Sequence, residues 1–111
     1  QAVLGKGPQI RFFDPTALSN RRLVQMVKGV ASKQKIPVQS AVRRSGGTDA
    51  STTHLHDRGV PTVVIGVPAR AIHTHSSMID LEDYRQAVSL VVAILKKMDA
   101  STVSSFTDYS A

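Results

Sequence analysis

An almost uninterrupted apolar run from Val60 to Val67 constrains the fold of this chain more than any other stretch. It is rich in valine, lacks polar and apolar alternation, and is followed by Pro68, so it fits a strand buried on both faces better than a helix. We therefore expect Val60–Val67 to be the central, parallel strand of a sheet. Because proline lacks a backbone N–H group, the chain should leave the sheet at Pro68 and carry the next loop onto the rim where α/β proteins bind ligands.

Two amphipathic helices are predicted on either side of this run. The first spans Asn20 to Gln34, with Ser19 or Asn20 as its N-cap. The second spans Leu81 to Met98, and its acidic start and basic end match the helix dipole. Its apolar stripe, which we expect to cover the sheet, consists of Leu81, Tyr84, Val88, Val91, Leu95 and Met98.

Shorter segments complete an α/β pattern. Gln9–Phe13 and Val38–Val42 are typical of strands, and a short helix is expected from Ala50 to about Asp57. The alternation of strands and helices predicts a mostly parallel sheet flanked by helices. The segment 101–111 is rich in serine and threonine without periodicity, so we expect a flexible tail there.

The composition fits one globular domain. Of 111 residues, 41% are hydrophobic and 20% are charged, which is ordinary for such a domain. No segment has the roughly 18 consecutive apolar residues of a membrane-spanning helix, so we expect no membrane contact. The absence of cysteine excludes disulfides and thiolate metal sites and fits a reducing compartment, which favours a cytoplasmic protein. The chain begins with Gln1 and shows no signal-peptide pattern, and we expect it to be cut from a longer polypeptide.

The net charge of +6 raises nucleic acid as a partner. The basic residues, however, occur as scattered pairs without a long run. Only three phenylalanines and two tyrosines accompany them, so surfaces for stacking on bases are scarce. We therefore expect no nucleic-acid partner.

Four histidines are the clearest candidates for chemistry, and they form two His-x-His pairs. His54 and His56 fall in the expected short helix, where residues two apart point about 200° from each other and suit no shared ion. His73 and His75 lie in the loop after the apolar run, where that objection does not apply. From the residues alone, His73 is either a metal ligand or acid–base group, or an ordinary surface histidine. Asp49 follows a strand and is expected on the same rim as His73.

Other patterns typical of catalysis are weak or missing. The sequence has no Gly-x-Ser-x-Gly motif and no cysteine nucleophile. Asp80, Glu82 and Asp83 are explained as charges at the start of a helix. Gly5-Lys6-Gly7 lacks the spacer and the hydroxyl residue of a phosphate-binding loop, so a plain turn is expected.

Four short motifs occur in a characteristic order: Gly5-Lys6-Gly7-Pro8, Ser45-Gly46-Gly47-Thr48-Asp49-Ala50, Gly59-Val60-Pro61-Thr62, and Ile72-His73-Thr74 followed by Asp80-Leu81. In order and spacing they resemble the C-terminal third of the tetrahedral aminopeptidases. These are glutamyl or deblocking aminopeptidases with two metal ions, some of which carry the name endoglucanase. The resemblance covers almost the whole chain, so the combination is far more specific than any single motif.

The resemblance implies a zinc-aminopeptidase-like catalytic domain, of which residues 1–100 are the C-terminal part. It implies a peptide-cleaving hydrolase with two divalent ions, zinc or cobalt, and a dimer-based dodecamer when full length. His73 matches the last metal ligand, while Gly47, Thr48 and Asp49 match the wall of the substrate site. In that family the other ligands and the general base lie upstream, so no catalytic residue is expected in this chain. Alone, it should be inactive.

Some alternatives stay open on the sequence. A competing interpretation is a small basic α/β module that binds RNA or a protein partner, favoured if the natural chain has only these 111 residues. Manganese would suit the metal ligands as zinc and cobalt do. The substrate preference is open, because Arg43 and Arg44 either attract an acidic side chain or are ordinary solvated charges.

Overall fold

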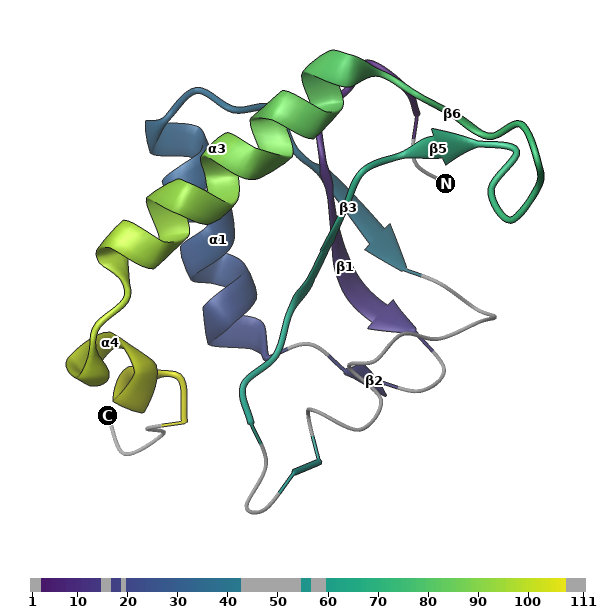
Figure 1. The fold of residues 1–111 in the computed structure, drawn as a ribbon. Coiled ribbons are helices and arrows are strands. Elements are labelled where there is room, and N and C mark those ends of the chain that lie inside the picture. The colour runs from purple at the N-terminus through teal and green to yellow at the C-terminus, as the bar shows by residue number, and fades with distance from the viewer. Residues whose placement is uncertain (1–2, 15–16, 19, 43–54, 57–59, 108–111) are drawn as a thin grey trace.

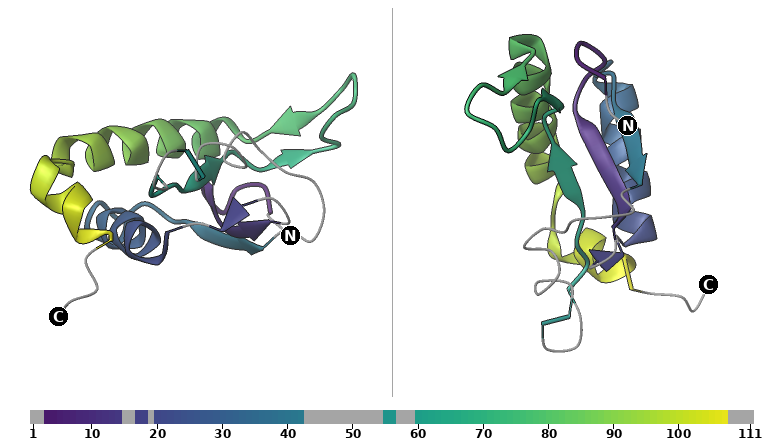
Figure 2. Two further views of the ribbon diagram at one scale, coloured as in Figure 1. Left: turned by 90° about the horizontal axis from the view of Figure 1, so that it is seen from below. Right: turned by 90° about the vertical axis from the view of Figure 1, so that its right-hand side faces the viewer.

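The structure, a computed structural model, describes residues 3–14, 17–18, 20–42, 55–56 and 60–107. Two long helices lie together beside a small sheet, and a two-stranded hairpin projects from one end (Figure 1, Figure 2). This arrangement confirms the predicted α/β class with helices flanking a sheet. In chain order the elements are β1 (Gln9–Asp14), β2 (Ala17–Leu18), α1 (Arg21–Lys33), β3 (Gln39–Val42), β4 (Val64–Gly66), β5 (Ala69–Arg70), β6 (Met78–Ile79), α3 (Leu81–Lys97) and α4 (Ala100–Ser105).

Strand β1 lies at the centre of the main sheet. It pairs with β3 in parallel, and its residues Gln9 to Arg11 also pair with β4 in antiparallel orientation. Because the same residues of β1 pair with both strands, β3 and β4 lie on opposite edges of β1. The short β2 pairs antiparallel with Phe13 and Asp14 at the other end of β1. The sheet is therefore mixed, and its centre is a segment that the sequence marked only as one short strand among others.

The prediction that Val60–Val67 forms the central parallel strand is wrong. Only Val64–Gly66 forms a strand, and it is antiparallel to β1. Among the described strands it pairs with β1 alone, so it lies at an edge. Its residues are half-buried, although Val63 and Ile65 pack against the core. A continuous apolar run indicates burial on two faces, but it carries no information about strand direction or neighbours.

Helix α1 confirms the first predicted helix. Asn20 is the N-cap, and its Oδ1 accepts a hydrogen bond from the backbone N–H of Leu23 at 2.9 Å. The backbone N–H of Asn20 also donates to the Thr62 carbonyl at 3.0 Å, which ties the start of the helix to the segment before β4. The buried face consists of Leu23, Val24, Val27, Val30 and Ala31.

Helix α3 confirms the second predicted helix but not the face that it buries. Asp80 is the N-cap, and its Oδ1 accepts from the backbone N–H of Glu82 at 2.8 Å. Of the predicted stripe, only Met98 packs against the core, whereas Leu81, Tyr84, Val88, Val91 and Leu95 are 41% to 66% exposed. The helix is apolar around much of its circumference, so two stripes have helical spacing, and periodicity alone does not choose between them. The stripe that is buried consists of Asp83, Ala87, Leu90 and Ile94.

One hydrophobic core joins the helices to the sheet. Ile10 of β1 and Leu90 of α3 are fully buried in it, together with the apolar face of α1. Helix α1 packs against both β1 and α3, so the core lies where these three elements meet. Within the described ranges, no helix combines the length and the apolar character that crossing a membrane requires.

Asp83 fastens the start of α3 to the loop that precedes β1. Among the described residues it is the only buried polar side chain, with 1% of its surface exposed. Its Oδ2 accepts from the backbone N–H of Gly5 at 2.9 Å and its Oδ1 from that of Gly7 at 2.8 Å. Gly7 has a φ of 91°, and a Cβ there would lie 1.9 Å from the Pro37 carbonyl oxygen, so only glycine fits. The Gly-Lys-Gly turn thus directs its N–H groups at a carboxylate of its own chain.

The segment expected to be a flexible tail begins with a helix. Residues Ala100–Ser105 form α4, and the following Phe106 is buried in the core. Asn20 Nδ2 donates to the Phe106 carbonyl at 3.2 Å, and Arg22 Nη1 donates to the Ser105 carbonyl at 2.7 Å. Helical periodicity is not visible in the sequence here because α4 is short. One buried aromatic side chain and these hydrogen bonds hold the helix in place.

The N-cap of α4 predicts a local dependence of helix stability on pH. The backbone N–H of Thr102 donates to Asp99 Oδ1 at 2.7 Å, and this bond lowers the pKa of Asp99 below its ordinary value of 3.8. Because the folded pKa is the lower one, the stabilisation is complete above the unfolded pKa and is lost as the pH falls through the folded pKa. We expect the protection of the α4 amides, measured relative to their intrinsic exchange rates, to fall selectively over that acidic range, whereas Asp99→Asn, which also caps helices, should remove the pH dependence.

Candidate functional site

The histidine loop is carried by a two-stranded hairpin. Strands β5 and β6 are antiparallel, with Ala69 opposite Ile79 and Arg70 opposite Met78. Pro68, at the entry to the hairpin, is buried, and the chain leaves the main sheet there as the sequence predicted. Helix α3 begins directly after β6, so the hairpin is held at its base by Pro68 on one strand and by the N-terminus of α3 on the other.

The loop of the hairpin, residues 71–77, has an unusual backbone. Ala71 and His73 have φ values of 55° and 63°, in the left-handed region that non-glycine residues seldom adopt. Thr74 Oγ1 donates to the Ala71 carbonyl at 2.6 Å, and the backbone N–H of Ser76 donates to the same hydroxyl at 3.4 Å. These bonds close the turn around His73. Such conformations cost about 1–3 kcal/mol each and cluster at functional sites.

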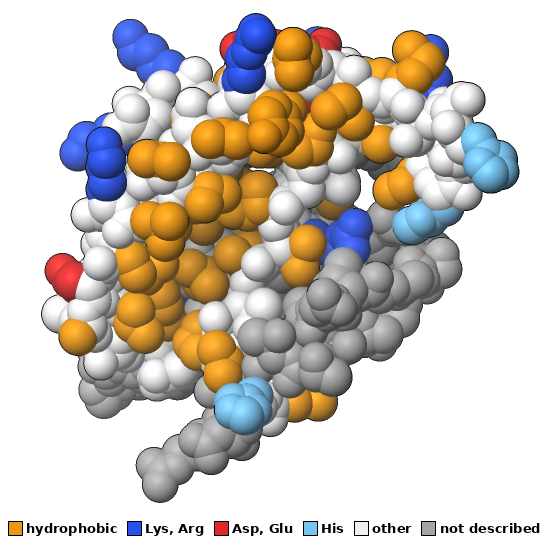
Figure 3. Space-filling view, viewed as in Figure 1, with side chains coloured by type: hydrophobic (Ala, Val, Ile, Leu, Met, Phe, Trp, Pro, Cys, Tyr) orange, Lys and Arg blue, Asp and Glu red, His pale blue; other side chains and the backbone are white. Residues whose placement is uncertain are grey.

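His73 and His75 are both exposed, and histidine side chains stand out at the end of the hairpin in Figure 3. A neutral imidazole is a good ligand for zinc or cobalt. Within the part of the chain that the structure describes, however, no three histidine, aspartate or glutamate side chains are grouped closely enough to hold an ion.

The other predicted site residues lie outside the described residues. These residues are Arg43, Arg44, Gly47, Thr48, Asp49 and His54. Most of the expected helix from Ala50 to Asp57 also lies outside the described residues. His56 is described and is exposed. The closeness of Asp49 to His73 stays a prediction, but the parallel topology from which it was argued is wrong. β3 ends beside Phe13 and β4 ends beside Gln9, so their carboxyl ends lie at opposite ends of the sheet.

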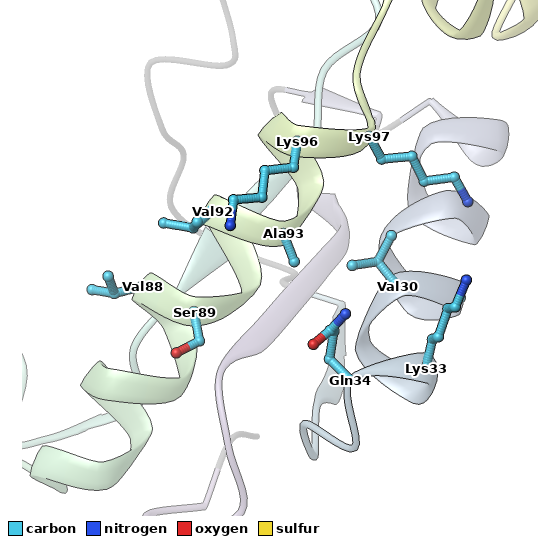
Figure 4. Close-up of a pocket in the computed structure, with 10 residues that line it drawn as sticks. Val30, Lys33, Gln34, Val88, Ser89, Val92, Ala93, Lys96 and Lys97 are labelled. Atoms are coloured by element: carbon cyan, nitrogen blue, oxygen red, sulfur yellow. The ribbon is translucent and has the colours of Figure 1, made fainter.

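A hollow of the described surface lies away from the hairpin. It is a groove of ≈ 670 Å³ between α1 and α3, lined by valines, small residues and lysines (Figure 4). A second hollow of ≈ 280 Å³, between α3 and the segment before β4, is lined mostly by apolar side chains. Among their described lining residues, neither hollow has a histidine or a carboxylate.

The family of the chain follows from its sequence. The profile of the M42 glutamyl aminopeptidases matches residues 1–90. The chain therefore belongs to the M42 glutamyl aminopeptidase family, as the four motifs predicted.

Individual relatives agree with this assignment. The chain is 34% identical over 106 residues to the glutamyl aminopeptidase of Lactococcus lactis, and the match covers 96% of this chain and 30% of that protein. The crystal structure of the TET aminopeptidase from a marine-sediment Thaumarchaeota archaeon matches with a TM-score of 0.92 and 38% identity, over 94% of this chain and 29% of that one. The TET1 peptidase of Pyrococcus horikoshii, which assembles into a tetrahedron or a large octahedral shell, matches with a TM-score of 0.75 and 34% identity, over 84% and 27% of the two chains. This chain thus spans less than a third of the length of these relatives.

Proposed function

We propose that residues 1–100 are the C-terminal part of the catalytic domain of a metal-dependent aminopeptidase, followed by the terminal segment 101–111. The family match over residues 1–90 carries this proposal. The complete enzyme would remove N-terminal residues from peptides. Two divalent ions, zinc or cobalt, would polarise the peptide carbonyl and activate water when bound.

Within this chain, the proposed contribution to chemistry is small and specific. His73 would bind one ion through its imidazole. Its exposure at the end of the hairpin leaves the ring accessible to an ion whose other ligands come from the rest of the polypeptide. Gly47, Thr48 and Asp49 would form part of the wall that contacts the substrate. The remaining ligands and the general base would come from the rest of the polypeptide, so the 111 residues alone should neither bind metal tightly nor hydrolyse peptides.

The assembly and location of the complete enzyme are also proposals. The tetrahedral assembly of the Pyrococcus horikoshii peptidase supports a homo-oligomer built from dimers, with twelve subunits as the resemblance implies. The cysteine-free sequence supports a cytoplasmic location.

The proposed activity is tested on the longer polypeptide that carries these residues. We expect it to release N-terminal residues from peptides with a free amine, to lose this activity after treatment with a chelator, and to regain it with zinc or cobalt. The same peptides with an acetylated N-terminus serve as the matched control and should stay intact. Hydrolysis that survives complete metal removal, or cleavage at internal bonds, would contradict the proposal.

A further inference from the structure

The outward side of α3 carries a continuous apolar surface, which we call the outer face of α3. Figure 3 shows hydrophobic side chains gathered over this helix and the adjoining surface. Monomeric proteins seldom expose continuous apolar patches, and such patches mark sites of interaction. The outer face consists of Leu81, Tyr84, Val88, Val91, Val92 and Leu95, each 41% to 66% exposed.

The groove beside this face has room for another segment of chain. Its lining includes three small residues, Gly29 of α1 with Ser89 and Ala93 of α3 (Figure 4). A Cβ built at Gly29 would meet no atom within 4 Å, so the space above this helix is open. Glycine inside a helix costs about 1 kcal/mol relative to alanine, and its usual benefit is the close approach of another backbone.

The spacing and charge of the surface indicate which kind of segment fits. Leu81, Val88 and Leu95 recur at intervals of seven residues, with Tyr84 and Val91 between them, which is the pattern that packs against a second helix. Lys33, Lys96 and Lys97 line the groove, so a complementary helix would carry acidic side chains that face them.

We propose that the outer face of α3 is an internal interface, covered by an amphipathic helix from the remaining length of the same polypeptide. The Thaumarchaeota enzyme contains this fold at a TM-score of 0.92, yet the matched part is only 29% of its chain, which leaves most of that chain to cover exposed surfaces. Strand β4, which borders the second hollow, is also left with a free edge among the described strands. This inference rests on family membership and does not depend on the proposed hydrolysis.

Thiol labelling tests the inference, because the 111 residues contain no cysteine. Val92→Cys is compared in the 111-residue chain and in the longer polypeptide, with Val103→Cys on α4 as the matched control, since Val92 and Val103 are 45% and 42% exposed. The labelling rate of each engineered cysteine is measured by mass spectrometry of its peptide. In the longer polypeptide we expect Cys at 92 to react at least about tenfold more slowly than in the short chain, because only local opening would expose it. The control should react at similar rates in both.

The other outcomes would overturn the inference. Equal reactivity of Val92→Cys in the two polypeptides would show that the face stays open, and equal slowing at both positions would show unspecific shielding. Protection in the short chain together with a doubled mass in light scattering would identify a second copy as the occupant. A second variant, Gly29→Leu, fills the groove: we expect it to leave the melting temperature of the short chain unchanged or higher and to lower that of the longer polypeptide. A higher melting temperature in both would overturn the inference as well.

Discussion

Replacing His73 with alanine in the longer polypeptide is expected to remove one of two bound ions per subunit and to lower kcat/KM by more than about 100-fold. The magnitude follows from the effect of residues that only hydrogen-bond to a metal ligand and orient it. Mutating such a residue lowers metal affinity or activity by about 10–100-fold, so losing the ligand itself should cost more. His73 has the left-handed backbone conformation at the turn of the hairpin, and it matches the ligand position of the family resemblance. Metal content per subunit and the rate of peptide hydrolysis check this prediction.

His75→Ala is the matched control for this experiment. His75 lies on the same exposed loop, two residues further along, so both variants remove an imidazole from the same hairpin. We expect full metal occupancy and nearly unchanged hydrolysis in His75→Ala. Two ions and undiminished activity in His73→Ala would reject His73 as the ligand, and a reversed pattern would transfer the role to His75.

Replacing Asp83 with alanine is expected to destabilise the fold by about 2 kcal/mol, because its carboxylate accepts from two backbone donors, and the buried one of them costs about 1–3 kcal/mol when it is left without a partner. The two donors are the backbone N–H groups of Gly5 and Gly7, which both bind the Asp83 carboxylate. The free energy of unfolding in urea, compared with that of the unaltered chain, measures the effect.

Two further variants distinguish the contribution of the Asp83 hydrogen bonds to stability from the contribution of a negative charge at the start of α3. Glu82→Gln removes a neighbouring charge that is exposed and forms only a 3.9 Å ion pair with Arg85, so a loss below about 1 kcal/mol is expected. Asp83→Asn keeps one acceptor oxygen and should fall between the two. Equal stability of Asp83→Ala and Glu82→Gln would show that Asp83 acts only as a helix-terminal charge.

Local signals in the sequence were sufficient for the two long helices. Asn20 and Asp80 are N-caps whose side chains bond to nearby backbone N–H groups, and charges at the ends of α3 match its dipole. Such interactions span only a few residues, so the sequence pattern contains them completely. The hairpin loop with His73 was likewise placed after the apolar run, although its strands β5 and β6 are too short to have a recognisable alternation.

Features that depend on distant residues were not predictable in the same way. The direction of β4 and the central place of β1 depend on pairings between segments more than 50 residues apart in sequence. The pattern of hydrophobic residues does not indicate which distant segments pair. Asp83 already had a sufficient local explanation as a charge in the first turn of a helix, so nothing in the sequence pointed to its burial. The buried stripe of α3 was misassigned because two apolar stripes share one helix.

The bonds between Asp83 and the glycine turn also restrict how related sequences can diverge. The carboxylate accepts these hydrogen bonds only where Gly5 and Gly7 direct their N–H groups at it, and the buried N–H group of Gly7 in turn requires an acceptor. We therefore expect substitutions at the turn and at position 83 to occur together across related sequences, in spite of the more than 70 residues between them. A relative with a different residue at position 83 should also have a different path for the chain entering β1.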